Sequence, residues 1–61
     1  MNRLQLVRFN DQAYKIPLEQ YERFEYLRRK ILYAEENGWV EMERGYTVVL
    51  KGEFKGYRID E

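Results

Sequence analysis

The chain contains no cysteine and no histidine, and this absence constrains how its 61 residues can fold. A domain of this size buries only about 60% of its unfolded surface, so small domains commonly add disulfides, a zinc ion or a partner subunit. Disulfides are impossible here, and a zinc site would lack thiolate and imidazole ligands. Stability must come from tight packing or from oligomerisation, and ten aromatic residues (six Tyr, three Phe, one Trp) suit either.

Catalytic residue types are scarce as well. The sequence has no Ser, and Thr47 is its only Thr. Ser, Thr, Cys and His supply most of the nucleophiles, general bases and transition-metal ligands of enzymes. We therefore expect a non-enzymatic protein that works by binding and has no cofactor.

The charges balance, because eleven basic and eleven acidic residues give a formal net charge of zero. A nucleic-acid-binding protein usually has a basic excess, since neutralising phosphates supplies much of its affinity. The sequence begins without a secretory signal pattern, and no apolar run reaches the roughly 20 residues that span a bilayer. We expect a cytoplasmic protein that does not enter a membrane.

Hydrophobic patterning predicts a single domain of the α+β class over residues 1–61. We expect a β-hairpin over 3–16, a helix over 18–36 and a β-meander over 39–60. One antiparallel sheet with the helix packed across one face would give the order ββαβββ or ββαββ.

The predicted hairpin turns at Asn10 and Asp11, since both residue types tolerate left-handed backbone geometry. In one register, one face carries four apolar residues: Leu4, Leu6, Tyr14 and Ile16. Val7 and Phe9 then point the other way. Apolar side chains on both faces predict a hairpin that is at least partly covered on each side.

The predicted helix lies between Pro17 and Gly38. Pro17 suits the first helical position, where its missing N–H is harmless, and Gly38 suits the left-handed residue after the helix end. The segment 18–36 between them has no Gly and no Pro. Glu25 and Arg29 are four residues apart with the acid first, the favourable order for an ion pair along a helix.

Beyond the helix, two dipeptides predict turns, because each offers a Gly for a positive φ. They are Arg44 with Gly45 and Lys51 with Gly52. These turns would separate three strands of a meander: 39–43, 46–51 and 53–60.

At about 100° per residue, the helix has two distinct faces. The predicted core face is an apolar stripe: Phe24, Leu27, Ile31 and Ala34, widened by Tyr21 and Leu32. Tyr26 and Tyr33 align on the opposite side. Four charged residues surround them: Glu19, Glu22, Arg29 and Lys30. Tyr and Arg are enriched at binding hot spots, so this tyrosine face is the predicted contact surface for a protein partner. Alternatively, Trp39 folds back over Ala34 or Tyr33 and merely caps the helix.

The C-terminal segment offers a second surface, where basic and aromatic residues alternate: Lys51, Phe54, Lys55, Tyr57 and Arg58. Platforms for single-stranded nucleic acid combine these types, so a small nucleic-acid-binding protein is the alternative function. A charged strand that only protects a sheet edge from aggregation is the simpler interpretation.

Four carboxylates gather around the predicted helix end and the next strand: Glu35, Glu36, Glu41 and Glu43. Hard cations such as Mg²⁺ take oxygen ligands of this kind, but no calcium-loop spacing accompanies them. We expect a solvated acidic face and no metal.

These features predict a small module that binds another protein. Small, neutral domains without catalytic groups are common among phage and mobile-element inhibitors and adaptors, so occlusion of a host protein's site in the host cytoplasm is one form of this prediction. A homo-oligomer is also expected, most simply a dimer through the tyrosine face or a sheet edge. The remaining alternative, a structural subunit of a larger assembly, would expose more apolar surface when isolated.

Overall fold

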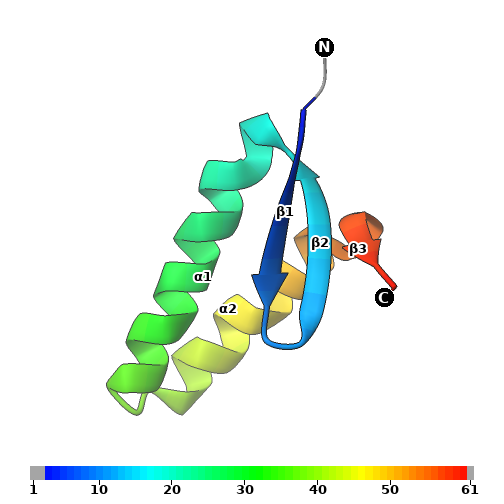
Figure 1. Cartoon of the computed structure of the whole chain (residues 1–61). Helices are drawn as coiled ribbons and strands as arrows, with labels where there is room; N and C mark the ends of the chain where they lie inside the picture. Colours follow the sequence, from blue (N-terminus) through cyan, green and yellow to red (C-terminus); the bar gives the residue numbers. More distant parts are fainter. Residues whose placement is uncertain (1–2, 61) are drawn as a thin grey trace.

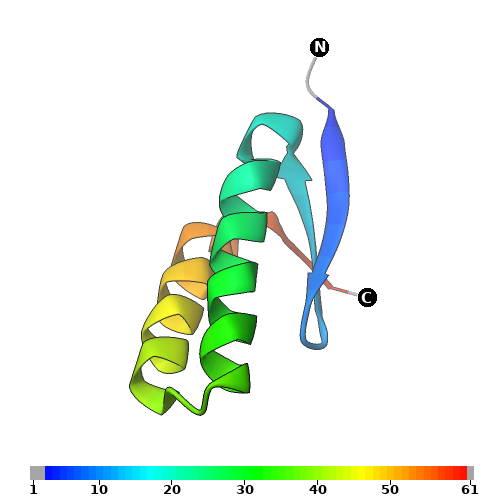
Figure 2. The same cartoon turned by 90° about the vertical axis from the view of Figure 1, so that its left-hand side faces the viewer.

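The computed structural model describes residues 3–60, which form a three-stranded antiparallel sheet with two helices on one side of it (Figures 1 and 2). The elements in chain order are β1 (Leu4–Phe9), β2 (Gln12–Pro17), the 3₁₀ turn η1 (Leu18–Gln20), α1 (Tyr21–Glu36), α2 (Val40–Glu53), the 3₁₀ turn η2 (Lys55–Tyr57) and β3 (Arg58–Ile59). The strand order is β1-β2-β3. The α+β class is confirmed, but the expected packing of a single helix is wrong.

The hairpin turns at Asn10 and Asp11 as predicted, with Asn10 at a φ of 55°. This two-residue turn places Phe9 opposite Gln12, and directly paired residues share a face of the sheet. The face that is covered by the helices carries four buried residues: Val7, Phe9, Tyr14 and Ile16. The predicted register is wrong, because it is shifted by one residue and groups Leu4 and Leu6, which are 58% and 54% exposed, with the buried residues of β2.

Pro17 ends a strand and does not begin the helix as predicted. Its φ of −59° and ψ of 145° are extended, and it lies opposite Leu4 in the hairpin. The next N–H, that of Leu18, donates to the carbonyl of Arg3 at 2.9 Å. This bond continues the hairpin for one more residue, so η1 intervenes before α1 begins at Tyr21.

The end of α1 is confirmed at Gly38, which has a φ of 73°. The N–H of Trp39 donates to the carbonyl of Ala34 at 2.8 Å, and that of Gly38 donates to Glu35 at 3.2 Å. These are the two bonds of a Schellman motif, which satisfies the last carbonyls of the helix. The chain then reverses, and α2 runs back beside α1 (Figure 2).

Helix α2 replaces the predicted strands 39–43 and 46–51 and the turns between them. Its β-branched residues and two glycines favour a strand or a turn by intrinsic propensity. However, Tyr46 and Leu50 are four residues apart, and both pack into the core. The apolar contact with α1 therefore overrides local propensity, as is usual for short helices. Thr47 adds a hydrogen bond from its hydroxyl to the Glu43 carboxylate at 2.9 Å.

The predicted strand 53–60 shrinks to the two residues of β3, and no meander forms within residues 3–60. Phe54 follows α2 and is 1% exposed, because its ring enters the core. β3 is held against β2 by ladder pairing and by the Gln12 side chain, whose amide donates to the carbonyl of Ile59 at 3.0 Å.

The core is organised around Phe24. Its ring centroid lies 5.5 Å from that of Tyr14 and 5.2 Å from that of Phe54, and Phe54 lies 6.2 Å from Tyr57. One series of ring contacts thus joins β2, α1 and the segment after α2.

The core stripe predicted for α1 is confirmed at four buried positions: Phe24, Leu27, Ile31 and Ala34. Tyr21 is partly buried against this core. Leu32 was predicted to widen the stripe, and this is wrong, because its side chain is 48% exposed. It lies about 100° around the helix from Ile31, beyond the reach of the sheet.

Ile31 is buried in the core and Leu32 is exposed on the surface. Replacing either residue with alanine removes the same number of side-chain atoms, so the two variants compare these environments directly. Ile31→Ala should lower the free energy of unfolding by roughly 2–5 kcal/mol, because a cavity forms in the core. Leu32→Ala should change it by about 0.5 kcal/mol, the usual size of a surface effect. Chemical denaturation measures both values, and equal losses would contradict the observed orientation of α1.

A substitution at Gly45 tests whether this residue lies in a helix, as observed, or in the predicted turn. A Cβ added at Gly45 would meet no atom within 4 Å. Gly45→Ala should therefore raise the free energy of unfolding by about 0.5–1 kcal/mol, since alanine stabilises a helix interior. Gly38→Ala is the matched control, and it should destabilise because of the positive φ at that position. A destabilised Gly45→Ala variant would argue for a turn at Gly45.

Candidate protein-binding surface

Tyr26 is exposed on α1 and held between two cations. Its side chain is 44% exposed. The guanidinium carbon of Arg23 lies 5.9 Å from the ring centroid, and Nζ of Lys30 lies 5.6 Å from it. These distances are typical of cation–π contacts, which restrict the ring without covering it.

Tyr33 meets Trp39, the residue that the Schellman motif returns to the end of α1. The two ring centroids are 5.5 Å apart and the ring planes are at 80°, an edge-to-face contact. The capping contact that was the alternative for Tyr33 therefore forms. Even so, Tyr33 remains 55% and Trp39 45% exposed, so the pair makes an aromatic ridge on the surface.

An ion pair across the helices fixes which sides of α1 and α2 adjoin. Nη2 of Arg23 lies 2.7 Å from Oε1 of Glu53, and Nε of Arg23 donates to Oε2 at 3.1 Å. The hydrogen bond from Arg23, aided by its positive charge, lowers the pKa of Glu53 below its ordinary value. In α1 itself, the predicted pairing of Glu25 with Arg29 is wrong, because Glu25 accepts a hydrogen bond from Arg28 at 2.8 Å.

Exposed apolar residues of α2 lie on the side of that helix that carries Glu53. At about 100° per residue, Met42 and Val49 lie beside Glu53 on α2, just as Tyr26 lies beside Arg23 on α1. Met42 and Val49 are each 41% exposed and, with Gly45 and Tyr46, line a shallow hollow. We call the combined surface, on the side of the helical hairpin away from the sheet, the outer face: Tyr26, Lys30, Tyr33, Met42, Tyr46 and Val49.

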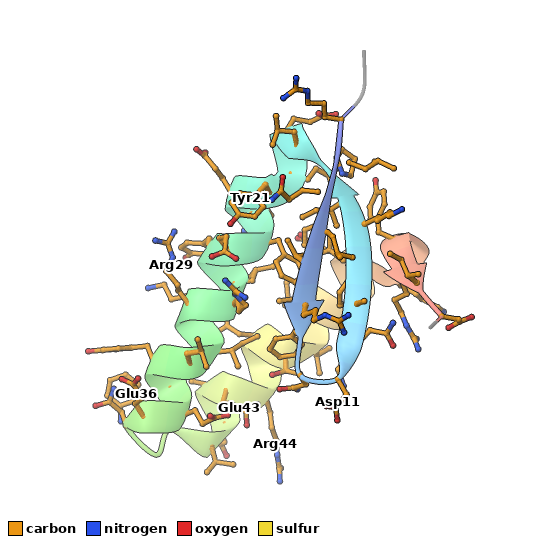
Figure 3. All side chains as sticks on the ribbon, in the orientation of Figure 1. Asp11, Tyr21, Arg29, Glu36, Glu43 and Arg44 are labelled. Atoms are coloured by element: carbon orange, nitrogen blue, oxygen red, sulfur yellow. The ribbon has the colours of Figure 1, made fainter. Side chains whose placement is uncertain are left out.

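The charged residues predicted around the tyrosines divide into two groups. Arg29 and Lys30 line a second hollow together with Tyr26 and Tyr33, and Figure 3 shows Arg29 projecting from α1 away from the strands. Neither Arg29 nor Lys30 has an ion-pair partner within residues 3–60. Glu22 is exposed on α1 but does not line this hollow.

Sequence reasoning missed the α2 half of the outer face, because it assigned Met42 and Val49 to different strands. Their spacing of seven residues was an available signal, since it aligns two residues along one side of a helix. The β-branched residues around Val49 hid this pattern.

The five residues of the predicted nucleic-acid surface do not form one platform. Phe54 is buried in the core and offers no ring face to a base, and Tyr57 packs partly against that core. Lys55 is exposed on η2. Lys51 and Arg58 alone among the five line a common hollow, with Gln12 and Tyr14.

The carboxylates considered as cation ligands are divided between two helices. Glu35 and Glu36 end α1, whereas Glu41 and Glu43 lie in the first turn of α2; Figure 3 shows Glu36 and Glu43 on their separate helices. In the described part of the chain, no group of three or more acidic, His or Cys residues is arranged to hold a metal ion. The same part contains no helix with the length and apolarity to cross a membrane.

The sheet presents a different surface for association. Among the described residues, β1 forms one edge of the sheet. Its exposed leucines, Leu4 and Leu6, point away from the helices. The outer backbone groups of an edge strand can pair with a second chain.

No protein-family model matches the chain, and comparisons with curated proteins and with solved structures find no similar one.

The hydrogen bonds from Arg23 to Glu53 predict a specific pH response. The carboxyl group of Glu53, followed by NMR, should titrate at a lower pH in the wild type than in Arg23→Gln. Because the folded-state pKa is lowered, the stabilisation from this pair is fully present above the unfolded-state pKa and disappears as pH falls through the folded-state pKa. Identical titration midpoints in the two proteins would show that the ion pair does not form in solution.

Proposed function

We propose that this protein is a non-enzymatic module of the cytoplasm that binds another protein through the outer face of its helical hairpin. The observation that carries the proposal is that α1 and α2 both expose aromatic or aliphatic side chains, on the sides of the helices that carry Arg23 and Glu53. Tyr26 and Tyr33 supply rings from one helix, and Met42 and Val49 supply flexible and branched side chains from the other. Tyrosine and methionine are enriched in the centres of protein interfaces.

Restriction of the aromatic anchors supports this role. Tyr26 contacts two cations, and Tyr33 contacts Trp39 edge to face. Side chains that are already restricted lose less conformational entropy on binding, so they contribute more of their contact energy to affinity. A few such anchors can dominate the energy of a small interface.

The charges around the outer face define the partner that fits it. Arg29 and Lys30 are adjacent to the tyrosines and have no ion pair within the described residues. A partner with an apolar patch beside Asp or Glu side chains would complement them. Such binding acts by occlusion, which is how an inhibitor or adaptor encoded by a phage would act on a host protein.

Two adjacent valines on α2 provide a matched test. Val49 belongs to the outer face, whereas Val48 is 70% exposed and points about 100° away. Val49→Glu and Tyr26→Glu should reduce binding of the partner at least tenfold, because each places a charge in an apolar contact. Val48→Glu should leave binding within about twofold. Quantitative capture from extracts of the source cells measures all three, with circular dichroism to confirm that each variant folds.

The partner is then the protein that the wild type and Val48→Glu both retain and that Val49→Glu loses. Light scattering over a wide concentration range tests whether the partner is a second copy of this chain. If the wild type is a dimer and Val49→Glu is a monomer, the outer face serves self-association. Equal capture and equal mass for the two valine variants would overturn the proposal.

A further inference from the structure

A small hollow lies where β2, β3 and the last turn of α2 meet. Its volume is about 140 Å³, and it is lined by Gln12, Tyr14, Lys51 and Arg58. These residues are separate from the outer face, so the hollow is independent of the proposed protein-binding surface. A volume of this size holds a few water molecules or one small chemical group.

Tyr14 contributes a phenol group to this hollow. The residue is only 1% exposed, since its ring packs against Phe24. No hydrogen bond within residues 3–60 involves its hydroxyl, which is accessible from the hollow. Arg58 is the ladder partner of Tyr14 in the pairing of β2 with β3. Burial raises the pKa of Tyr14, and the positive charge of Arg58 opposes that rise.

Two cations complete the lining. Among residues 3–60, Lys51 and Arg58 have no ion-pair partner and no carboxylate lines the hollow. The Gln12 amide donates to the carbonyls of Ala13 and Ile59, each at 3.0 Å. It thereby holds β3 against β2 and keeps Arg58 beside Tyr14.

We propose that this hollow binds a single small oxyanion, either a phosphoryl or a carboxylate group. The guanidinium, the ammonium and the phenol are all hydrogen-bond donors, and charge-assisted bonds to oxyanions are the strongest that such groups form. The C-terminal end of α2 carries the negative end of the helix dipole and offsets part of the charge of Lys51. Because the charge of Lys51 is partly offset, Arg58 and the Tyr14 hydroxyl are also needed to bind the oxyanion.

The test is a titration of the isotope-labelled full chain with inorganic phosphate at pH 7 and constant ionic strength, followed by amide chemical shifts. Saturable shifts should centre on Gln12, Tyr14, Lys51 and Arg58. Arg58→Gln and Tyr14→Phe should each weaken the affinity about tenfold, the effect of losing one hydrogen bond to a charged group. Tyr14→Phe retains the ring that contacts Phe24, and a thermal melt verifies that the core is intact.

Lys55→Gln is the matched control. It removes the same charge as Arg58→Gln from a neighbouring exposed position that does not line the hollow, so the affinity for phosphate should stay within about twofold. Parallel titration with acetate identifies the source of the group: stronger binding of phosphate indicates a phosphoryl ligand, and stronger binding of acetate a carboxylate. Shifts that do not saturate, or equal losses in Lys55→Gln and Arg58→Gln, would overturn the proposal.

Discussion

The packing of Phe24 between Tyr14 and Phe54 is the contact on which the rest of the structure depends. With no disulfide available, these rings connect the sheet, α1 and the end of α2. They also set both candidate sites. When Phe24 faces inward, Tyr26 and Tyr33 are directed outward by the geometry of the helix. When the Tyr14 ring is buried against Phe24, its hydroxyl is left at the border of the hollow that Arg58 lines.

Charged groups organise the surface more than they stabilise it. The pair of Arg23 with Glu53 is exposed, and exposed ion pairs contribute little to stability. The pair joins Arg23, which lies beside Tyr26 on α1, to Glu53, which lies beside Met42 and Val49 on α2. Glu25 is engaged by Arg28, so Arg29 remains unpaired within the described residues and is available to a partner. The outer face therefore combines a restricted apolar centre with basic neighbours, whereas the hollow beside β3 is lined by two cations, a phenol and an amide.

The features that were predicted correctly depend on residues close together in the chain. The turn at Asn10 and Asp11, the core stripe of α1 and the glycine at its end each follow from local geometry. Arg29, Lys30 and the two tyrosines were also found together from helical spacing. The register of the hairpin was missed although it was determined, since a two-residue turn makes Phe9 pair with Gln12 and buries Val7 instead of Leu6. Leu32 is apolar, but its angle on the helix directs it away from the core, so the predicted widening of the stripe on that side is wrong.

The sequence by itself determined that no disulfide holds the fold, that the hairpin and α1 form, and that tyrosines face outward on that helix. Only the tertiary structure decided the state of the segment 40–53, because its β-branched residues and glycines disfavour a helix while its apolar spacing can support one. Contact of Tyr46 and Leu50 with the core resolves that balance. The hollow also required the folded chain, since Tyr14 and Arg58 are brought together by the pairing of β2 with β3, a contact between residues far apart in the sequence.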